Sequence, residues 1–265
     1  MLLLVILLLQ AVMLLSSGSL GALALMISIL ITLLIFVDTF RYGNGRYIEP
    51  LDEMSWLVEG VKKEAKKADI KVPRLYLLDD YIPNAYSFGN TVVLSLGLFE
   101  ILNREEILAV VAHELGHIKN HDGLVFPVIA YGRVFMIMTT IFLLFIHASP
   151  YFIPISMASL IIYEWSRARF VRLREFKADT VAVSLLDNPI NLKEALEELE
   201  YYDDLMVRVK KHALPGIEPS IKRTEEDEGI QRQYWTPSVF SFPTHPTYNE
   251  RIAHIMTIVE SKMLR

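Results

Sequence analysis

The sequence has no cysteine among its 265 residues. This absence excludes disulfide scaffolds, thiol nucleophiles and cysteine-based metal sites, so any metal ion must be held by histidine and carboxylate side chains. An excess of positive charge is also lacking, because 26 lysine and arginine residues stand against 31 aspartate and glutamate residues, for a formal net charge of -5. The chain therefore has no overall attraction to nucleic acid, and we expect no nucleic-acid partner.

Long apolar runs, by contrast, are present. Hydrophobic residues make up 52% of the chain and the mean hydropathy is +0.34, which is more apolar than a typical soluble domain. Residues 1–15 contain one polar side chain, Gln10, and a second apolar run covers 20–37. A cleaved signal peptide is the alternative, but no basic segment precedes the first run and a second run follows it at once. We therefore predict a transmembrane hairpin over residues 1–40.

A second pair of apolar runs covers residues 124–146 and 151–165. This pair predicts another transmembrane hairpin over 124–165, and the lipid bilayer is then a partner of the chain. Arg133 lies inside the first of these runs, so it must pair within the protein or lie near the membrane interface. Two buried helices of a soluble domain are the alternative for this segment.

Basic residues follow the second and the fourth apolar runs, whereas the breaks within the two hairpins carry no lysine or arginine. By the positive-inside rule, the breaks face outward and the remaining polar segments face the cytoplasm. Four segments result: the hairpins 1–40 and 124–165, and two parts of one catalytic domain, 41–123 and 166–265. We expect a multi-pass protein of the cell membrane with this domain on the cytoplasmic side.

The polar segments carry the patterns of helices and short strands. Amphipathic helical spacing is found over residues 52–68, 191–212 and 246–264, and strand-like composition over 74–78 and 91–96. A small antiparallel sheet beside helices is the economical interpretation. The expected fold class is α+β: a mainly helical membrane protein with two hairpins and a domain carrying this sheet. The acidic stretch 215–237 has few apolar residues, and we expect it to form a loop.

One of the predicted helices carries a metal-binding pattern. Asn103, three residues before Glu106, gives a capping-box-like start, and apolar residues follow at helical spacing. His113 and His117 then lie one turn apart on one face, where both rings can reach the same metal ion. Glu114 is adjacent to that face, within reach of a water at the ion. This arrangement is typical of a hydrolytic zinc site, and a pair of surface histidines is the alternative.

A catalytic zinc needs a third protein ligand. His121 lies one further turn along, but three ligands in a line on one helix surround an ion poorly, and Gly123 occupies the position where the metzincin pattern has its third histidine. Glu175 follows the second hairpin, which returns the chain to the side that it left, so Glu175 can meet the two histidines. Asp179, one turn later, is suitably spaced to accept the free N–H of a ligand histidine. A solvated salt-bridge surface is the alternative for both carboxylates.

The ordered motifs of the chain resemble those of the HtpX-type membrane metalloproteases, relatives of the CAAX prenyl proteases. The motifs are His-Glu-Leu-Gly-His from residue 113, Glu-Phe-Lys-Ala-Asp from residue 175, and Thr-His-Pro from residue 244 with a following Arg-Ile pair. The two hydrophobic hairpins also fall where that family has its membrane spans, so the resemblance covers most of the chain.

The resemblance implies a gluzincin-like metalloprotease domain. His113, His117 and Glu175 would hold one zinc ion per chain, and Glu114 would take the proton from the attacking water. His245 and Arg251 would stabilise the developing oxyanion or position the substrate. For these last two residues, an ordinary helix start with an exposed histidine and a salt-bridging arginine is the alternative.

A substrate site is implied in the same way. The segment around Asn84 and Ala85, followed by the strand with Val93 and Leu94, is similar to the family's edge strand, which pairs with extended substrate. The implied substrates are unfolded polypeptides, and the implied function is turnover of damaged or misfolded membrane proteins. The alternatives are prenyl-peptide processing or cleavage within the bilayer, and a non-proteolytic zinc-binding scaffold or holdase. The oligomeric state does not follow from the sequence.

Overall fold

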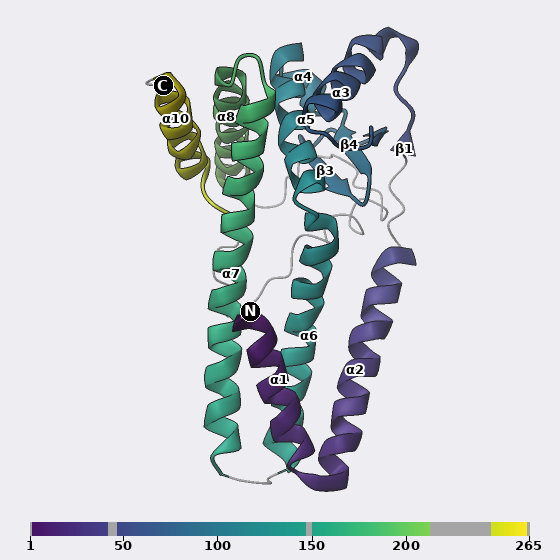
Figure 1. Ribbon diagram of the computed structural model, residues 1–265, viewed down its shortest axis with the longest axis vertical. Coiled ribbons are helices and arrows are strands. Elements are labelled where there is room, and N and C mark those ends of the chain that lie inside the picture. The colour runs from purple at the N-terminus through teal and green to yellow at the C-terminus, as the bar shows by residue number, and fades with distance from the viewer. Residues whose placement is uncertain (1, 42–46, 147–149, 213–244, 264–265) are drawn as a thin grey trace. The chain divides into compact units, whose positions relative to one another are not determined.

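The computed structural model describes residues 2–41, 47–146, 150–212 and 245–263 and is mainly helical (Figure 1). The loop expected over 215–237 lies outside the described residues. The chain divides into two compact units. The first unit comprises residues 1–44, 124–172 and 232–245, and the second comprises residues 45–123, 173–231 and 246–265.

The first unit consists of long apolar helices: α1 (Leu2–Leu15), α2 (Gly18–Arg41), most of α6 (Asp122–Ile146) and the first part of α7 (Phe152–Leu185). Among the described residues, two segments are long and apolar enough to cross a membrane, namely 18–36 of α2 and all of α6. Helix α1 is apolar but shorter, and α7 continues without a break through the domain boundary expected after residue 165. Two of the four predicted spans thus have the length and composition of a membrane-crossing helix.

Polar side chains inside the first unit find partners on neighbouring helices. The fully buried Gln10 donates to the hydroxyl oxygens of Ser156 at 3.0 Å and Ser159 at 2.6 Å. Arg133 lies with its Nε 3.0 Å from Oε1 of the buried Glu164, so the expectation that Arg133 pairs within the protein is confirmed. Such pairing is what an apolar environment requires of polar and charged groups.

The second unit contains a four-stranded sheet made of β1 (Tyr47–Ile48), β2 (Arg74–Leu78), β3 (Ala85–Phe88) and β4 (Thr91–Ser95), in the order β1-β2-β4-β3. The sheet is mixed: β2 and β4 are parallel, whereas the other two pairs are antiparallel. The expectation of an antiparallel sheet is therefore wrong. The reason is the β3–β4 hairpin, which turns at Gly89 (φ +54°) and inserts β4 between β2 and β3.

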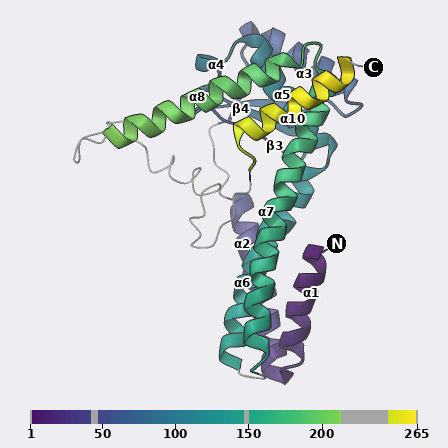
Figure 2. The same cartoon turned by 90° about the vertical axis from the view of Figure 1, so that its left-hand side faces the viewer.

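Helices that contact the sheet or one another form the core of the second unit together with the sheet (Figures 1 and 2). They are α3 (Ser55–Lys67), α4 (Leu98–Ile101), α5 (Arg104–Lys119), α8 (Ile190–His212) and α10 (Tyr248–Met263), together with the end of α7. The three predicted amphipathic helices are confirmed to within a few residues. Their apolar positions and those of the strands meet in one buried cluster that includes Leu57, Leu77, Leu94, Val111, Leu115, Leu192 and Ile255.

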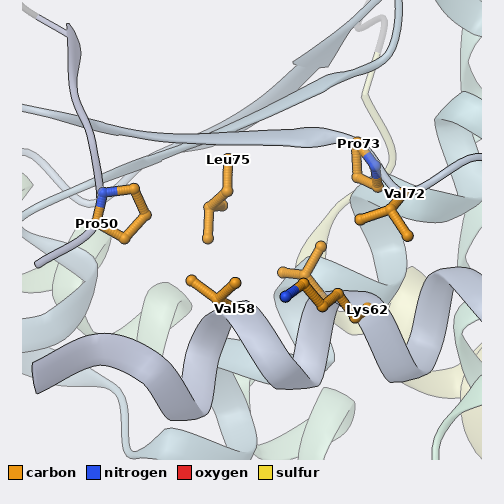
Figure 3. Close-up of a pocket in the computed structure, with 7 residues that line it drawn as sticks. Pro50, Val58, Lys62, Val72, Pro73 and Leu75 are labelled. Atoms are coloured by element: carbon orange, nitrogen blue, oxygen red, sulfur yellow. The ribbon is translucent and has the colours of Figure 1, made fainter. Parts of the chain in front are cut away.

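A half-open apolar pocket of about 190 Å³ lies between α3 and β2 (Figure 3). Its lining residues are Pro50, Val58, Val61, Lys62, Val72, Pro73 and Leu75. Figure 3 shows Leu75 on the strand and Val58 on the helix facing each other across it. None of the predicted site residues lines this pocket, so the candidate chemistry lies elsewhere in the unit.

Candidate metal centre

The helix that carries the two histidines begins as the sequence predicts. The side-chain oxygen of Asn103 accepts from the backbone N–H of Glu106 at 3.0 Å, and the Glu106 carboxylate accepts from the backbone N–H of Asn103 at 2.8 Å. This reciprocal cap satisfies two N–H groups at the start of α5. Residues 109–117 of the helix are all buried. The metal-binding pattern therefore lies in the core and not on a solvent-exposed face.

Three buried side chains converge on one point. His113, His117 and Glu175 are 7%, 8% and 6% exposed, and their potential ligand atoms all lie within 4.8 Å of one another. The two Nε2 atoms are 3.1 Å apart, and the Glu175 carboxylate oxygens lie 3.5 Å from Nε2 of His113 and 3.7 Å from Nε2 of His117. The structure thus brings Glu175 of α7 to the two histidines of α5. His121 is exposed and lies outside this group.

These separations match a tetrahedral metal site. Zinc binds histidine nitrogen and carboxylate oxygen at about 2.0–2.2 Å, which places any two ligand atoms about 3.3–3.5 Å apart. The observed separations of 3.1, 3.5 and 3.7 Å lie around this value. Two nitrogens and one oxygen leave a fourth position open, as in catalytic sites.

Each histidine is oriented by a carboxylate on its other ring nitrogen. Nδ1 of His113 lies 2.8 Å from Oδ1 of Asp179, and Nδ1 of His117 lies 2.8 Å from Oδ2 of Asp122. An Nδ1–H that donates to a carboxylate leaves Nε2 as the free lone pair, which is the atom that faces the cluster. Asp179 occupies the place predicted for it. The sequence analysis did not single out Asp122.

Asp122 is itself held in place. The guanidinium of Arg174 donates to the Asp122 carboxylate and to the backbone carbonyl of Asn120. Asp122 is the first residue of α6, directly after the two-residue break that ends α5. In the sequence, Asp122 is an acidic residue five positions after His117, and its partner Arg174 directly precedes Glu175.

Arg251 of α10 contacts the same network. Its Nε and Nη2 lie 2.9 and 2.5 Å from the two carboxylate oxygens of Asp179, and Nη2 lies 3.1 Å from Nδ1 of His113. Burial alone would raise the pKa of Asp179, but the charges of Arg251 and His113 outweigh it and lower this pKa to about 2. Burial and Arg251 act to lower the pKa of His113, but Asp179 and Glu175 raise it to about 9, so a metal ion bound at Nε2 would displace a proton from this ring. Asp179 is therefore an ionised acceptor at neutral pH.

Two features of α5 complete the centre. Glu114 is buried, and its Oε2 atom has no hydrogen-bond partner within the described part of the chain. A buried carboxylate oxygen without a partner is costly and points to a missing group. Gly116 lies where α5 approaches α7: a Cβ there would come within 2.7 Å of the Ala178 carbonyl oxygen. This close approach brings Glu175 to the histidines.

The remaining predicted residues are placed as follows. His245 is exposed, and its role stays a prediction. Ala85 is the first residue of β3, which is an edge strand, and Asn84 directly precedes it. Val93 and Leu94 lie in β4, which pairs with strands on both sides, and both side chains are fully buried. A role of Val93 and Leu94 in substrate binding stays a prediction, and the edge strand next to β4 is β3.

The chain is similar in sequence to known proteases. The family described as Peptidase family M48 matches residues 52–259 of the chain. The Protease HtpX homolog of Persephonella marina is 32% identical over 229 residues, covering 78% of this chain and 75% of the relative. The Protease HtpX homolog 1 of Saccharolobus solfataricus is 28% identical over 256 residues, covering 84% and 81%.

A solved structure has a similar fold. The crystal structure of S. mikatae Ste24p superposes with a TM-score of 0.52 at 17% sequence identity. The match covers 86% of this chain but spans only 57% of the Ste24p chain. At this identity the likeness concerns the fold alone.

Proposed function

Because this chain belongs to peptidase family M48, we propose that it is a zinc-dependent endopeptidase of the cell membrane whose catalytic centre is the cluster of His113, His117 and Glu175. Family membership makes the chain a metalloprotease; the metal identity and the role of each residue are the proposal. One observation carries it. Three buried ligand atoms converge beside Glu114, whose buried Oε2 has no partner among the described residues.

The ligand set favours zinc. Two imidazole nitrogens and one carboxylate oxygen form a set that zinc binds in hydrolytic enzymes, with one position left for substrate or water. A zinc ion held there would supply Lewis-acid chemistry, polarising the carbonyl of a peptide bond and lowering the pKa of water to near neutral pH. Asp179 and Asp122 fix the two imidazole rings so that Nε2 of each faces the point where the three proposed ligand atoms converge.

Glu114 is the proposed general base and acid. Its carboxylate accepts the proton of the attacking water and passes it to the departing amine. Arg251 holds Asp179 through two hydrogen bonds, and we assign it to keeping His113 in place. A direct role of His245 on the oxyanion rests on the sequence resemblance alone.

The proposed substrates are polypeptides in an extended conformation, drawn from damaged or misfolded membrane proteins. The edge strand β3, beginning at Ala85, offers backbone groups to a substrate strand, and backbone pairing selects for unfolded segments more than for sequence. Arginine and lysine residues follow the second and the fourth apolar runs and are lacking in the breaks within the hairpins. This distribution supports a cytoplasmic location of the catalytic domain. Two helices with the length and hydropathy of membrane spans support the bilayer as partner.

The test compares zinc content and casein cleavage in detergent for the wild-type chain, Glu114→Gln and Glu175→Ala. All are purified without metal and then supplied with zinc. Glu114→Gln is expected to keep zinc and lose cleavage, whereas Glu175→Ala is expected to bind zinc weakly. Glu105→Gln, on an exposed position of the same helix, is the matched control and should behave as the wild type. Stoichiometric zinc in every variant with no cleavage by the wild type would favour the scaffold function instead.

A further inference from the structure

Three residues of helix α10 form hydrogen bonds with α7 near the histidine–glutamate cluster. Arg251 pairs with Asp179, His254 contacts Phe176 and Thr180, and Lys262 donates to the Val183 carbonyl at 3.1 Å. The apolar side of α10 is buried in the core at Ile255 and Val259. The contacted segment of α7 begins one residue after Glu175. Helix α10 therefore packs directly on the turn that carries the third metal ligand.

His254 binds the backbone of that turn. Its Nε2 lies 3.1 Å from the carbonyl oxygen of Phe176 and 3.0 Å from Oγ1 of Thr180. A carbonyl oxygen only accepts, so Nε2 carries the proton and donates. The two rings of Phe176 and His254 also lie against each other, with centroids 4.9 Å apart.

The bonded carbonyl is a sensitive point of α7. Phe176 O also accepts from the hydroxyl of Thr180 at 2.8 Å, a contact between residues four apart that tends to bend a helix. His254 also donates to this carbonyl. Glu175 is the preceding residue and Asp179 lies one turn after Glu175, so a change in the tilt of this carbonyl would shift both carboxylates.

We propose that His254 is a positioning residue for the metal centre, and that docking of α10 and metal binding are thermodynamically coupled through it. This inference rests on the proposed metal site. His254 is not among the proposed ligands; within the described part of the chain its ring bonds Phe176 and Thr180 instead. It acts through the backbone of Phe176, as Arg251 acts through Asp179. Because coupling is reciprocal, an ion that orders this turn also strengthens the docking of α10.

The test uses the full-length protein and Zn²⁺ alone as the probe. The zinc dissociation constant is measured by competition with a chelator for wild type, His254→Leu, His254→Gln and Thr257→Ala. Hydrogen exchange of α10 is measured with and without zinc. Thr257 is the matched control, because it is exposed on the same helix and its hydroxyl donates to the Ala253 carbonyl of that helix at 2.9 Å.

His254→Leu is expected to weaken zinc binding about three- to tenfold, less than or equal to the loss seen when a direct partner of a ligand is removed. His254→Gln, which keeps an N–H donor, should restore most of the affinity, and Thr257→Ala should not change it. Zinc should slow exchange in α10 of the wild type and do so less in His254→Leu.

Three outcomes would overturn the inference. The first is an unchanged zinc affinity in His254→Leu, even if its melting temperature is lower. The others are a zinc affinity of His254→Gln no higher than that of His254→Leu, and a hydrogen-exchange rate in α10 that does not change when zinc is added. A wild-type chain that binds no zinc would instead refute the proposed metal site itself. The two failures are therefore distinguishable.

Discussion

Gly116 offers a sharp test of how the centre is assembled. It lies inside the metal-binding helix, between the two histidines and directly against α7. A Cβ added at Gly116 would lie 2.7 Å from the carbonyl oxygen and 2.9 Å from the Cα of Ala178, both backbone atoms. Ordinary contact begins at 3.4 Å. Gly116→Ala therefore requires α5 and α7 to separate locally by about 0.7 Å, the difference between 3.4 and 2.7 Å.

This separation would displace the proposed metal ligands relative to one another. Ala178 is three residues after Glu175, less than one helical turn, so movement of α7 at Ala178 carries Glu175 away from the histidines. Catalytic constellations must be held within about 0.5 Å of their productive geometry, and a displacement of about 1 Å costs up to about 100-fold in rate. We expect zinc binding in Gly116→Ala to weaken about tenfold or more, with cleavage falling by about 10- to 100-fold.

The loss should exceed what stability alone explains. Overpacking costs about 1–3 kcal/mol, whereas alanine in place of glycine inside a helix recovers up to about 1 kcal/mol. The variant should therefore fold, and its melting temperature should fall by only a few degrees. The assays are chelator competition for zinc, casein cleavage in detergent and thermal unfolding.

Gly60→Ala is the matched control. Its new Cβ would meet the Cδ2 atom of Leu108 at 2.3 Å, the far end of a flexible side chain that can rotate away. We expect a similar change in stability and unchanged zinc affinity. A Gly116→Ala protein that binds zinc and cleaves casein like the wild type would refute the argument that close helix approach positions Glu175.

Three further predictions concern the surroundings of the centre. Asp122→Asn should weaken zinc binding about 10- to 100-fold by releasing the His117 ring, while casein cleavage recovers at saturating zinc. Asn103→Ala should lower the free energy of unfolding by about 1 kcal/mol, measured by thermal melting, with unchanged zinc affinity. Asp187 is exposed, and hydrogen bonds from two lysines of α3 lower its pKa from 3.8 to about 2, so its contribution to stability is complete above pH 4 and lost toward pH 2. The difference in melting temperature between wild type and Asp187→Asn should therefore be constant above pH 4 and shrink below it.

Local patterns in the sequence predict the parts of this fold that local physics determines. The cap at Asn103 and the spacing of His113 and His117 depend on residues three or four apart, and the structure agrees with both. The sheet is different. Whether β4 runs parallel or antiparallel to β2 depends on which side of it the β3–β4 hairpin folds, and strand composition carries no such information. The same insertion buries Val93 and Leu94 and gives the free edge to β3.

The two carboxylates that orient the histidine rings differ in how far the sequence predicts them. Asp179 could be expected because it shares a helix face with Glu175, one turn away. Asp122 reaches His117 across the break between α5 and α6. Its carboxylate is held by a hydrogen bond from Arg174, which is 52 residues further along the chain. No periodicity links such positions, because they meet only when α5 and α7 pack together.

One residue did carry a sequence signal for that packing. A glycine inside a helix costs about 1 kcal/mol relative to alanine, so a glycine within a strongly capped, buried helix has a packing or functional reason. Gly116 lies between His113 and His117, and the close backbone of Ala178 leaves no room for a side chain there. Since Ala178 lies between Glu175 and Asp179, the glycine in the first motif and the alanine in the second mark the same helix crossing. The two motifs thus specify, beyond the ligands themselves, the contact that brings the ligands together.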